Sequence, residues 1–361
     1  MRIDTVTYAD FRNIKSATLT LSDGVNILAG NNGAGKTSAL EGMHIFAQGR
    51  SFRTKRDAEL INFGSKCASI SMRFSDNKRQ NEATYRLDTA KKKRFCRLNG
   101  VDVTRLSEFI GAFRAVLFCP ADLRLVSDGP LIRRQFIDAA LSQLYPAYVS
   151  LLQRYNDILS QRNALLRAAS ERRGDRRVNL DTLEIWSEQL ADASAKVAAR
   201  RDAYVGRLDS VVKELISDMT SGAEQVSLCY ERARSFEEYM QMLTCNVERE
   251  VRMGTTLFGA HRDDMTITLG GREAKAFSSQ GQQRSIAMAL KLAEGMLSRE
   301  ETGEYPVFLL DDIFSELDEG RKRYLVRGLE GRQVIITSCD LFPAEGAKIF
   351  IVSDGEITEE Q

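Results

Sequence analysis

The stretch that decides the fold reads GNNGAGKT at residues 30–37. It fits the spacing G-x-x-x-x-G-K-[ST] of a phosphate-binding loop, in which glycines let backbone N–H groups curl around a phosphate. An apolar run at 25–29 precedes the loop and a helix-like run through Phe46 follows it. The alternative is a structural glycine-rich turn, but the strand, loop and helix order is the one that nucleotide binding requires.

We therefore expect this loop to hold the phosphates of ATP. Lys36 would reach the β and γ phosphates, and Thr37 would ligate Mg²⁺. The residues expected to bind the nucleotide here are Gly30, Asn31, Asn32, Gly33, Ala34, Gly35, Lys36, Thr37 and Ser38.

A second segment, VFLLDD at residues 307–312, has the pattern of a short β-strand that ends in two acids. Such a strand places a carboxylate beside the Mg²⁺ of a P-loop nucleotide. Asp311 would hold the metal through its water shell, and Asp312 would orient or deprotonate the attacking water. The candidate catalytic residues are therefore Lys36, Asp311 and Asp312, with Thr37 and Asp311 at the metal. Taken alone, the segment also fits a buried strand with a solvated acidic turn.

The segment FSSQGQQR at residues 277–284 opens a helix-like run. Its Ser-x-Gly-Gln pattern resembles the signature motif of ABC-type ATPases, with Ser279, Gly281 and Gln282 at the matching positions. In that family the signature of one head closes over the γ phosphate bound by a second head, so the resemblance implies an ATP-dependent homodimer. The alternative is an ordinary helix start, because Ser followed three residues later by Gln is also a capping box. The sequence SELD at 315–318 resembles the D-loop that crosses such a dimer interface.

Composition is compatible with a two-lobed intracellular protein. The 361 residues are 43% apolar, which is enough for substantial cores, and 51 Lys and Arg balance 50 Asp and Glu. DNA contact would therefore need local basic patches. The six cysteines have no metal-binding or C-x-x-C spacing, which fits a reducing compartment. No apolar run is long enough to span a bilayer, so we expect a cytoplasmic protein without membrane contact.

The order of strand and helix signals predicts an α/β fold with an inserted helical lobe. Short strand signals fill much of the first 120 residues, including a hairpin with the turn Asn99-Gly100. Apolar residues at helical spacing then follow, and the long stripe from Leu183 to Leu215 predicts one helix packed antiparallel on the preceding one. We expect residues 1–120 plus 255–361 to form an ABC-type P-loop ATPase head, and residues 121–254 a mainly helical lobe with an antiparallel arm.

Several segments together resemble the bacterial recombination mediator family RecF. They are FRNI at 11–14, GRSFRT at 49–54, PADL at 120–123, RRQFID at 133–138, YNDILSQRNALL at 155–166, GAHRDD at 259–264, SSQGQQR at 278–284 and LLDDIFSELD at 309–318. The resemblance spans nearly the whole chain. It implies ATP-dependent dimerisation, binding of double-stranded DNA near single-strand gaps, and action with RecR and RecO to help load RecA. It also implies that Arg12 and Asn13 lie near the adenine.

Departures from related ATPases predict slow hydrolysis that resets a dimer. The strand at 334–336 is followed by Thr337, Ser338, Cys339 and Asp340, where transporter ATPases place a histidine against the γ phosphate. Asp312 is one methylene shorter than the glutamate of those transporters. Two other classes share such a head, a transporter's ATPase subunit and a short SMC-like structural ATPase. The missing histidine and the long helical insertion fit the first poorly, and the arm is too short for the second.

The candidates for DNA contact are basic clusters. One strand of the Asn99-Gly100 hairpin carries Lys91, Lys92, Lys93, Arg94 and Arg97. Such a run fits a phosphate groove, although charges on edge strands also act as solubilising gatekeepers. Arg50 and Arg53 follow the P-loop helix and fit either nucleotide or DNA. Four more arginines, 172, 173, 176 and 177, fall at the expected tip of the arm, where a solvated loop is the default.

Overall fold

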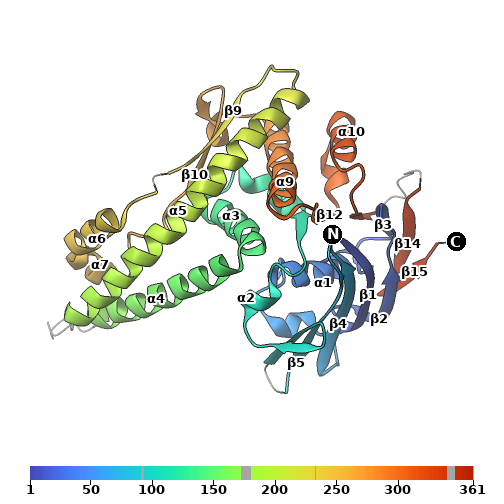
Figure 1. Ribbon diagram of the computed structural model, residues 1–361, viewed down its shortest axis with the longest axis horizontal. Helices are drawn as coiled ribbons and strands as arrows, with labels where there is room; N and C mark the ends of the chain where they lie inside the picture. Colours follow the sequence, from blue (N-terminus) through green and yellow to red (C-terminus); the bar gives the residue numbers. More distant parts are fainter. Residues whose placement is uncertain (91–92, 172–179, 232, 340–345, 361) are drawn as a thin grey trace.

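The computed structural model describes residues 1–90, 93–171, 180–231, 233–339 and 346–360. The chain forms a layered head, which carries both termini, and a helical lobe that projects from it (Figure 1). Among the described residues, no helix combines the length and the apolar character needed to cross a bilayer.

One face of the head is a six-stranded antiparallel sheet. Its strand order is β2-β1-β4-β5-β6-β7. The strands are β1 (Arg2–Phe11), β2 (Ile14–Thr20), β4 (Cys67–Ser75), β5 (Gln80–Asp88), β6 (Lys93–Leu98) and β7 (Val101–Val103). The β6–β7 turn has positive φ at both Asn99 and Gly100, 51° and 81°, so the hairpin predicted there is confirmed.

A second, mostly parallel sheet lies deeper in the head. Its order is β15-β14-β3-β13-β12-β8, and only the β14–β15 pair is antiparallel. The strands are β3 (Val25–Ala29), β8 (Ala115–Phe118), β12 (Val307–Asp311), β13 (Val334–Ser338), β14 (Lys348–Ser353) and β15 (Glu356–Glu359). All residues of β8 and β12 are buried, as expected for strands covered on both faces.

Helix α1 (Lys36–Gln48) is the layer between the two sheets, and its side chains share one core with both. A Cβ at Gly42 would lie 2.5 Å from the Tyr8 ring, so glycine lets the helix approach the antiparallel sheet. On the other face of the parallel sheet, α9 (Gln280–Thr302) and α10 (Glu319–Gly328) contribute Met288, Leu292 and Leu325 to a separate core. The head is therefore built of four layers.

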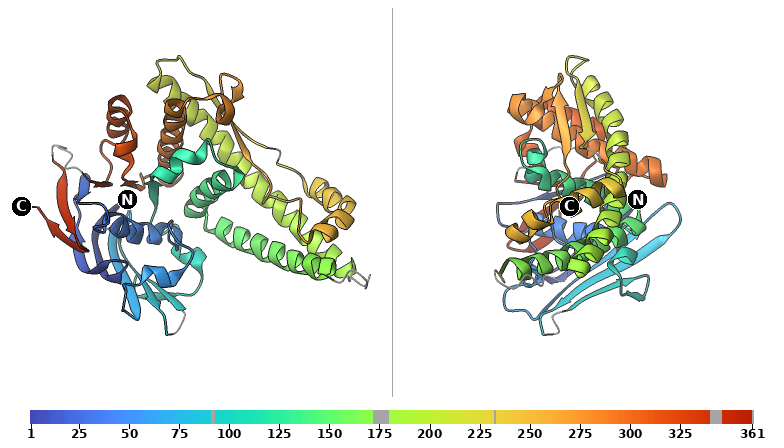
Figure 2. Two further views of the ribbon diagram at one scale, coloured as in Figure 1. Left: turned by 180° about the vertical axis from the view of Figure 1, so that it is seen from behind. Right: turned by 90° about the vertical axis from the view of Figure 1, so that its left-hand side faces the viewer.

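The projecting lobe is mainly helical. It contains α3 (Pro130–Leu144), α4 (Pro146–Glu171), α5 (Leu180–Met219), α6 (Phe236–Cys245) and α7 (Val247–Met253). Helices α4 and α5 converge at the tip of the lobe and diverge toward the head, where α3 packs between them (Figures 1 and 2). The long helix predicted from the stripe at 183–215 is thus confirmed. The four arginines expected at the arm tip lie outside the described residues.

A small sheet and short helices complete the chain. The sheet has the order β11-β10-β9, with β9 (Val226–Tyr230), β10 (Met265–Leu269) and β11 (Arg272–Glu273). The short helices are η1 (Asp57–Leu60), α2 (Leu106–Phe109), η2 (Pro120–Leu125), α8 (Ala274–Phe277) and η3 (Ile313–Glu316). Ile286 and Ala289 of α9 join the core of the helical lobe, while Met288 and Leu292 join the head. Helix α9 therefore ties the two lobes together.

Charged side chains hold the loop at 255–264 inside the helical lobe, whose core includes Ala260 and Met265, so this lobe extends past the boundary expected at residue 254. Arg162 is fully buried and donates to Glu250 at 2.6 Å and to Thr256 at 2.9 Å. Arg201 pairs with Asp138 at 2.8 Å and donates to the carbonyl of Ala260 at 2.6 Å. A different loop conformation would separate these buried charges from their partners. Because an unpaired buried charge is costly, the pairs favour one conformation of the loop.

Candidate nucleotide-binding site

Sheet topology brings the two sequence motifs together. Strands β3, β13 and β12 are parallel neighbours, so their carboxyl ends meet at one edge. Ala29 pairs with Ser338, and Thr337 pairs with Asp311. The loop that follows β3 and the acids that end β12 therefore flank the end of β13. This is the edge at which open α/β sheets bind ligands.

The loop at residues 30–37 leads directly into α1. The helix begins at Lys36, and its N-cap residue Gly35 has φ 125° and no side-chain cap. A Cβ at Gly35 would also lie 3.0 Å from the amide nitrogen of Asn13, so this position favours glycine on two grounds. The first-turn N–H groups of α1 therefore face the loop as an anion site.

Lys36 is held by the loop itself. Its ammonium donates to the carbonyl oxygens of Gly30 at 2.5 Å and Asn31 at 2.9 Å. The side chain is 6% exposed. A cation held against the loop carbonyls lies where the phosphates of a P-loop nucleotide would bind.

Two hydroxyls and one carboxylate converge beside the loop. The Thr37 hydroxyl donates to Oδ1 of Asp311 at 2.8 Å, and the Thr337 hydroxyl donates to the same oxygen at 2.8 Å. Burial raises the pKa of Asp311 above its usual range. A hydroxyl paired with a carboxylate beside a phosphate loop fits Mg²⁺, which takes oxygen ligands and shares them with nucleotide phosphates.

The second acid lies at a sharp backbone turn. Asp312 has φ 50°, a conformation uncommon for a residue with a side chain, and its N–H donates to the Thr337 hydroxyl at 2.9 Å. This turn sends the Asp312 side chain to the groove while Asp311 remains 7% exposed. The two neighbouring acids therefore have different surroundings.

A groove of about 640 Å³ runs over the loop. This volume is within the ordinary range of small-ligand sites, about 300–1,000 Å³. The groove is lined by Arg12, Asn13, Asn32, Gly33, Gly35, Lys36, Thr37, Ser38, Arg53, Glu59, Ile61, Asn62, Phe63, Asp312 and Thr337. Nine of these are among the residues expected from the sequence. Gly30, Asn31, Ala34 and Asp311 do not line it, and support the residues that do.

Sequence patterns did not predict the buried carboxylate of Glu41, which binds two arginines that line the groove. Glu41 is 0% exposed and accepts two hydrogen bonds from Arg12, at 2.9 and 2.7 Å, and one from Ser51. Arg53 lies 3.4 Å away from the same carboxylate. The signal that was available is a single acid in an otherwise apolar helix run, SALEGMHIF, at residues 38–46.

The residues of the expected signature lie at the start of α9. Ser279 caps the helix and its hydroxyl accepts the N–H of Gln282 at 3.2 Å, so the capping box is formed. Ser279, Gly281 and Gln282 do not line the groove of their own chain. They lie beside the segment expected as the D-loop, because Arg284 pairs with Glu316 at 3.1 Å and Arg321 packs against Gly281.

Comparison with known proteins agrees with this geometry. Residues 2–350 match the family model of the RecF/RecN/SMC N-terminal domain. The chain is 36% identical to the DNA replication and repair protein RecF of an Exiguobacterium species, over 100% of both chains. It is 38% identical to RecF of Halothermothrix orenii, over 99% of both chains. The chain belongs to the RecF family.

Solved structures support the same assignment. A structure described as the recombination mediator protein RecF-ATPrS in the RecFOR pathway matches with a TM-score of 0.91 at 31% identity, covering 99% of this chain and 98% of that one. The Smc head domain of Pyrococcus furiosus shares the fold, with a TM-score of 0.57 at 17% identity. The predicted fold class, an α/β ATPase head of the ABC type with an inserted helical lobe, is confirmed.

This RecF-family chain has no histidine among the described residues that line the groove. His44 packs edge-on against Phe52, and burial lowers its pKa to about 3. His261 bonds to the hydroxyl of Tyr155 at 2.7 Å in the helical lobe. At the end of β13, Cys339 instead donates to the side-chain oxygen of Asn32 at 2.9 Å. Asp340 lies outside the described residues.

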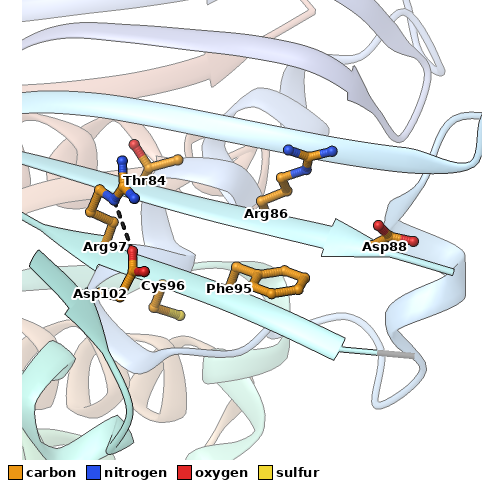
Figure 3. A pocket seen from close by; sticks show the side chains of 7 residues that line it. All are labelled: Thr84, Arg86, Asp88, Phe95, Cys96, Arg97 and Asp102. Atoms are coloured by element: carbon orange, nitrogen blue, oxygen red, sulfur yellow. Dashed lines mark hydrogen bonds and ion pairs between the residues drawn. The ribbon is translucent and has the colours of Figure 1, made fainter. Parts of the chain in front are cut away.

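The basic hairpin of this RecF-family chain forms the β6–β7 edge of the antiparallel sheet, with Arg94 and Arg97 on opposite faces. Arg94 forms two hydrogen bonds to Asp57, at 2.5 and 2.8 Å, and Arg97 donates to Asp102 at 2.9 Å. Figure 3 shows Arg97 beside a cavity of about 330 Å³ that shares no lining residue with the nucleotide groove. Lys91 and Lys92 lie outside the described residues, and the side chain of Lys93 is not described.

Proposed function

We propose that this chain is an ATP-gated, DNA-binding recombination mediator. The observation that carries the proposal is the convergence of Thr37 and Asp311 beside a glycine-rich loop, in a chain similar over its whole length to RecF. Lys36 would bind the β and γ phosphates of ATP, Thr37 and Asp311 would hold Mg²⁺, and Asp312 would orient the attacking water. Phosphate oxygens of the nucleotide would supply further ligands to the metal.

The proposed gate is a homodimer that shares its nucleotides. Ser279 and Gly281, with Gln282 behind them, would close over the γ phosphate held by the partner's loop. Two features support this role: α9 begins at these residues, so its N-terminus favours an anion, and the expected D-loop packs beside them. ATP would hold the two heads together, and hydrolysis would release them.

Turnover in this proposal is slow, with ATP acting as a switch. The catalytic end of β13 carries Thr337 and Cys339 in place of a histidine, and Asp312 is a short acid. We expect a turnover below about 10 s⁻¹, the median for enzymes. A measured turnover well above that median would contradict the proposal that ATP acts as a switch.

Double-stranded DNA near single-strand gaps is the proposed polymer ligand, in the cytoplasm, with RecR, RecO and RecA as pathway partners. Arg94 and Arg97 already have carboxylate partners, so either would have to exchange a carboxylate for a phosphate. Arg86, on the same face of the sheet as Arg97, is exposed and makes no ion pair with any described residue, which makes it the better candidate (Figure 3). The overall charge of +1 means that any such contact is local.

The test is the binding of a labelled duplex that contains a single-strand gap, measured by fluorescence anisotropy with ATP, with ADP and without nucleotide. We expect tight, salt-sensitive binding only with ATP and Mg²⁺, and none with ATP for Lys36→Met. Arg86→Gln should weaken DNA binding while ATP affinity is retained. Equal DNA binding with and without ATP would refute the gate.

A further inference from the structure

One aromatic side chain at the rim of the nucleotide groove is fully exposed. Phe63 has a relative exposure of 103%, the highest of the large apolar side chains that the structure describes as exposed. It lines the same groove as Lys36 and Thr37. Exposing a whole phenyl ring to water forgoes the hydrophobic stabilisation that its burial would provide. A ligand that covers the ring would recover that gain.

The backbone under Phe63 is fixed. The N–H of Asn62 donates to the carbonyl of Asp10 at 2.8 Å, and its side-chain amide donates to the carbonyl of Arg12 at 2.7 Å. On the other side, the N–H of Ser65 donates to the carbonyl of Asn62 at 3.0 Å and its hydroxyl to Asp10 at 2.8 Å. These bonds tie the loop to the β1–β2 turn and hold the backbone of Phe63 at the groove.

The polar neighbours of Phe63 have little hydrogen-bonding capacity left for a base. Arg12 uses its guanidinium on Glu41 and on the carbonyl of Glu59, at 2.8 Å for the latter. The amide nitrogen of Asn13 donates to the carbonyls of Gly33 and Ala34, at 3.2 and 3.1 Å. A nucleobase at this rim would therefore meet a flat apolar ring and donors that are already engaged.

We propose that Phe63 stacks on the nucleobase of the nucleotide whose phosphates the loop at 30–37 binds. The proposal rests on the proposed function of that loop. The phosphate end of the groove is defined by Lys36 and Thr37, and the segment that carries Ile61 and Phe63 contributes an apolar rim to the same groove. Stacking of a base on an aromatic ring strengthens binding, and alanine substitution of the ring removes that contribution.

The experiment compares two ligands that share phosphates but differ in the base. Isothermal titration with ATP and with inorganic tripolyphosphate, both with Mg²⁺, is carried out on the wild type, Phe63→Ala, Phe63→Trp and Lys36→Met. We expect Phe63→Ala to weaken ATP binding about tenfold or more and to leave tripolyphosphate binding unchanged. Phe63→Trp should retain ATP affinity, because it keeps a stacking surface.

The matched control is Phe95→Ala, another exposed phenylalanine, which lies on the outer sheet face (43% exposed). It should bind both ligands like the wild type. Unchanged ATP affinity in Phe63→Ala overturns the proposal and points to a protein contact for this ring, as does an equal loss for both ligands. Failure of the proposed function is distinguishable, because neither the wild type nor Lys36→Met would then bind either ligand.

Discussion

The hydroxyl of Thr37 donates a 2.8 Å hydrogen bond to the carboxylate of Asp311, across 274 positions of the chain. Thr337, on strand β13, donates to the same carboxylate oxygen. Parallel pairing of β3, β13 and β12 produces this meeting, because it brings the ends of all three strands to one edge. In the proposed mechanism this oxygen pair holds Mg²⁺.

Removing the Thr37 hydroxyl should uncouple ATP binding from Mg²⁺. We expect Thr37→Ala to weaken ATP binding about tenfold when Mg²⁺ is present, because one oxygen ligand is lost. With EDTA, the variant and the wild type should bind ATP alike. Thr37→Ser keeps the hydroxyl and is the control. Titration of a fluorescent ATP analogue measures both affinities, and a loss of equal size in EDTA would contradict a metal role.

Asp311→Asn should stabilise the protein when no nucleotide is present. Burial raises the pKa of Asp311, so the folded chain binds this proton more readily than the unfolded chain and the ionised carboxylate costs stability at neutral pH. That cost is absent below the ordinary carboxyl pKa of about 3.9 and grows as the pH rises through the raised value. The advantage of Asp311→Asn in urea unfolding should therefore be present at pH 7–8 and vanish near pH 3.

The control for that series is Asp202→Asn, since Asp202 is an exposed residue of α5. Its stability should follow the wild type at every pH. The asparagine at 311 keeps an oxygen that accepts from Thr37 and Thr337, so packing is preserved. If Asp311→Asn were less stable than the wild type throughout, the carboxylate would be a structural anchor and not a destabilising ligand.

Glu41→Gln should destabilise the head. The substitution keeps the shape of the side chain but removes the charge that pairs with Arg12 at 2.7 Å in a site where Glu41 is 0% exposed. Breaking one side of a buried ion pair costs about 3–5 kcal/mol, and the partial exposure of Arg12 places this case at about 3 kcal/mol or less. Urea denaturation measures the loss in the free energy of unfolding.

The matched comparison is Asp23→Asn, which breaks an exposed ion pair with Arg2. Surface pairs of this kind contribute about 1 kcal/mol or less. If the urea midpoint of Glu41→Gln is no lower than that of Asp23→Asn, the ion pair between Arg12 and Glu41 contributes little to stability.

ATP should protect one particular cysteine from alkylation. The Cys339 sulfur lies 3.6 Å from the Lys36 ammonium and 2.9 Å from the Asn32 side chain, at the loop that would hold the phosphates. Peptide mass spectrometry after iodoacetamide treatment should find slower labelling of Cys339 with ATP and Mg²⁺. Labelling of Cys229 and Cys245, both exposed, should not change. An unchanged alkylation rate at Cys339 would contradict the proposal that the phosphates bind at this edge of the loop.

Local sequence patterns were enough to predict the head's principal parts. The loop at 30–37, the strand at 307–311 and the hairpin at Asn99-Gly100 each carry a spacing or turn signal that depends on near neighbours only. The long helix α5 also followed from its apolar stripe. The contact between Thr37 and Asp311 also depends on strand order, because β13 must lie between β3 and β12, and no local pattern encodes that order.

Other parts of the site depend on contacts that no local pattern encodes. Glu41 forms its pairs with Arg12 and Arg53 only after α1 has packed between the two sheets. Phe63 is one phenylalanine among 17, and only its exposure at the groove distinguishes it. For the basic hairpin, the partner of Arg94 could not be read from spacing, because Asp57 comes from a distant segment.

The central claim is that two chains share each ATP, and sedimentation velocity tests it most directly. Wild type, Lys36→Met and Ser279→Arg are compared with excess ATP and Mg²⁺, each with and without duplex DNA. We predict that the wild type dimerises only with ATP, that Lys36→Met stays monomeric because it binds no nucleotide, and that Ser279→Arg binds ATP yet stays monomeric. If Ser279→Arg dimerises like the wild type, the segment at 277–284 is only a capped helix, and the shared site is contradicted.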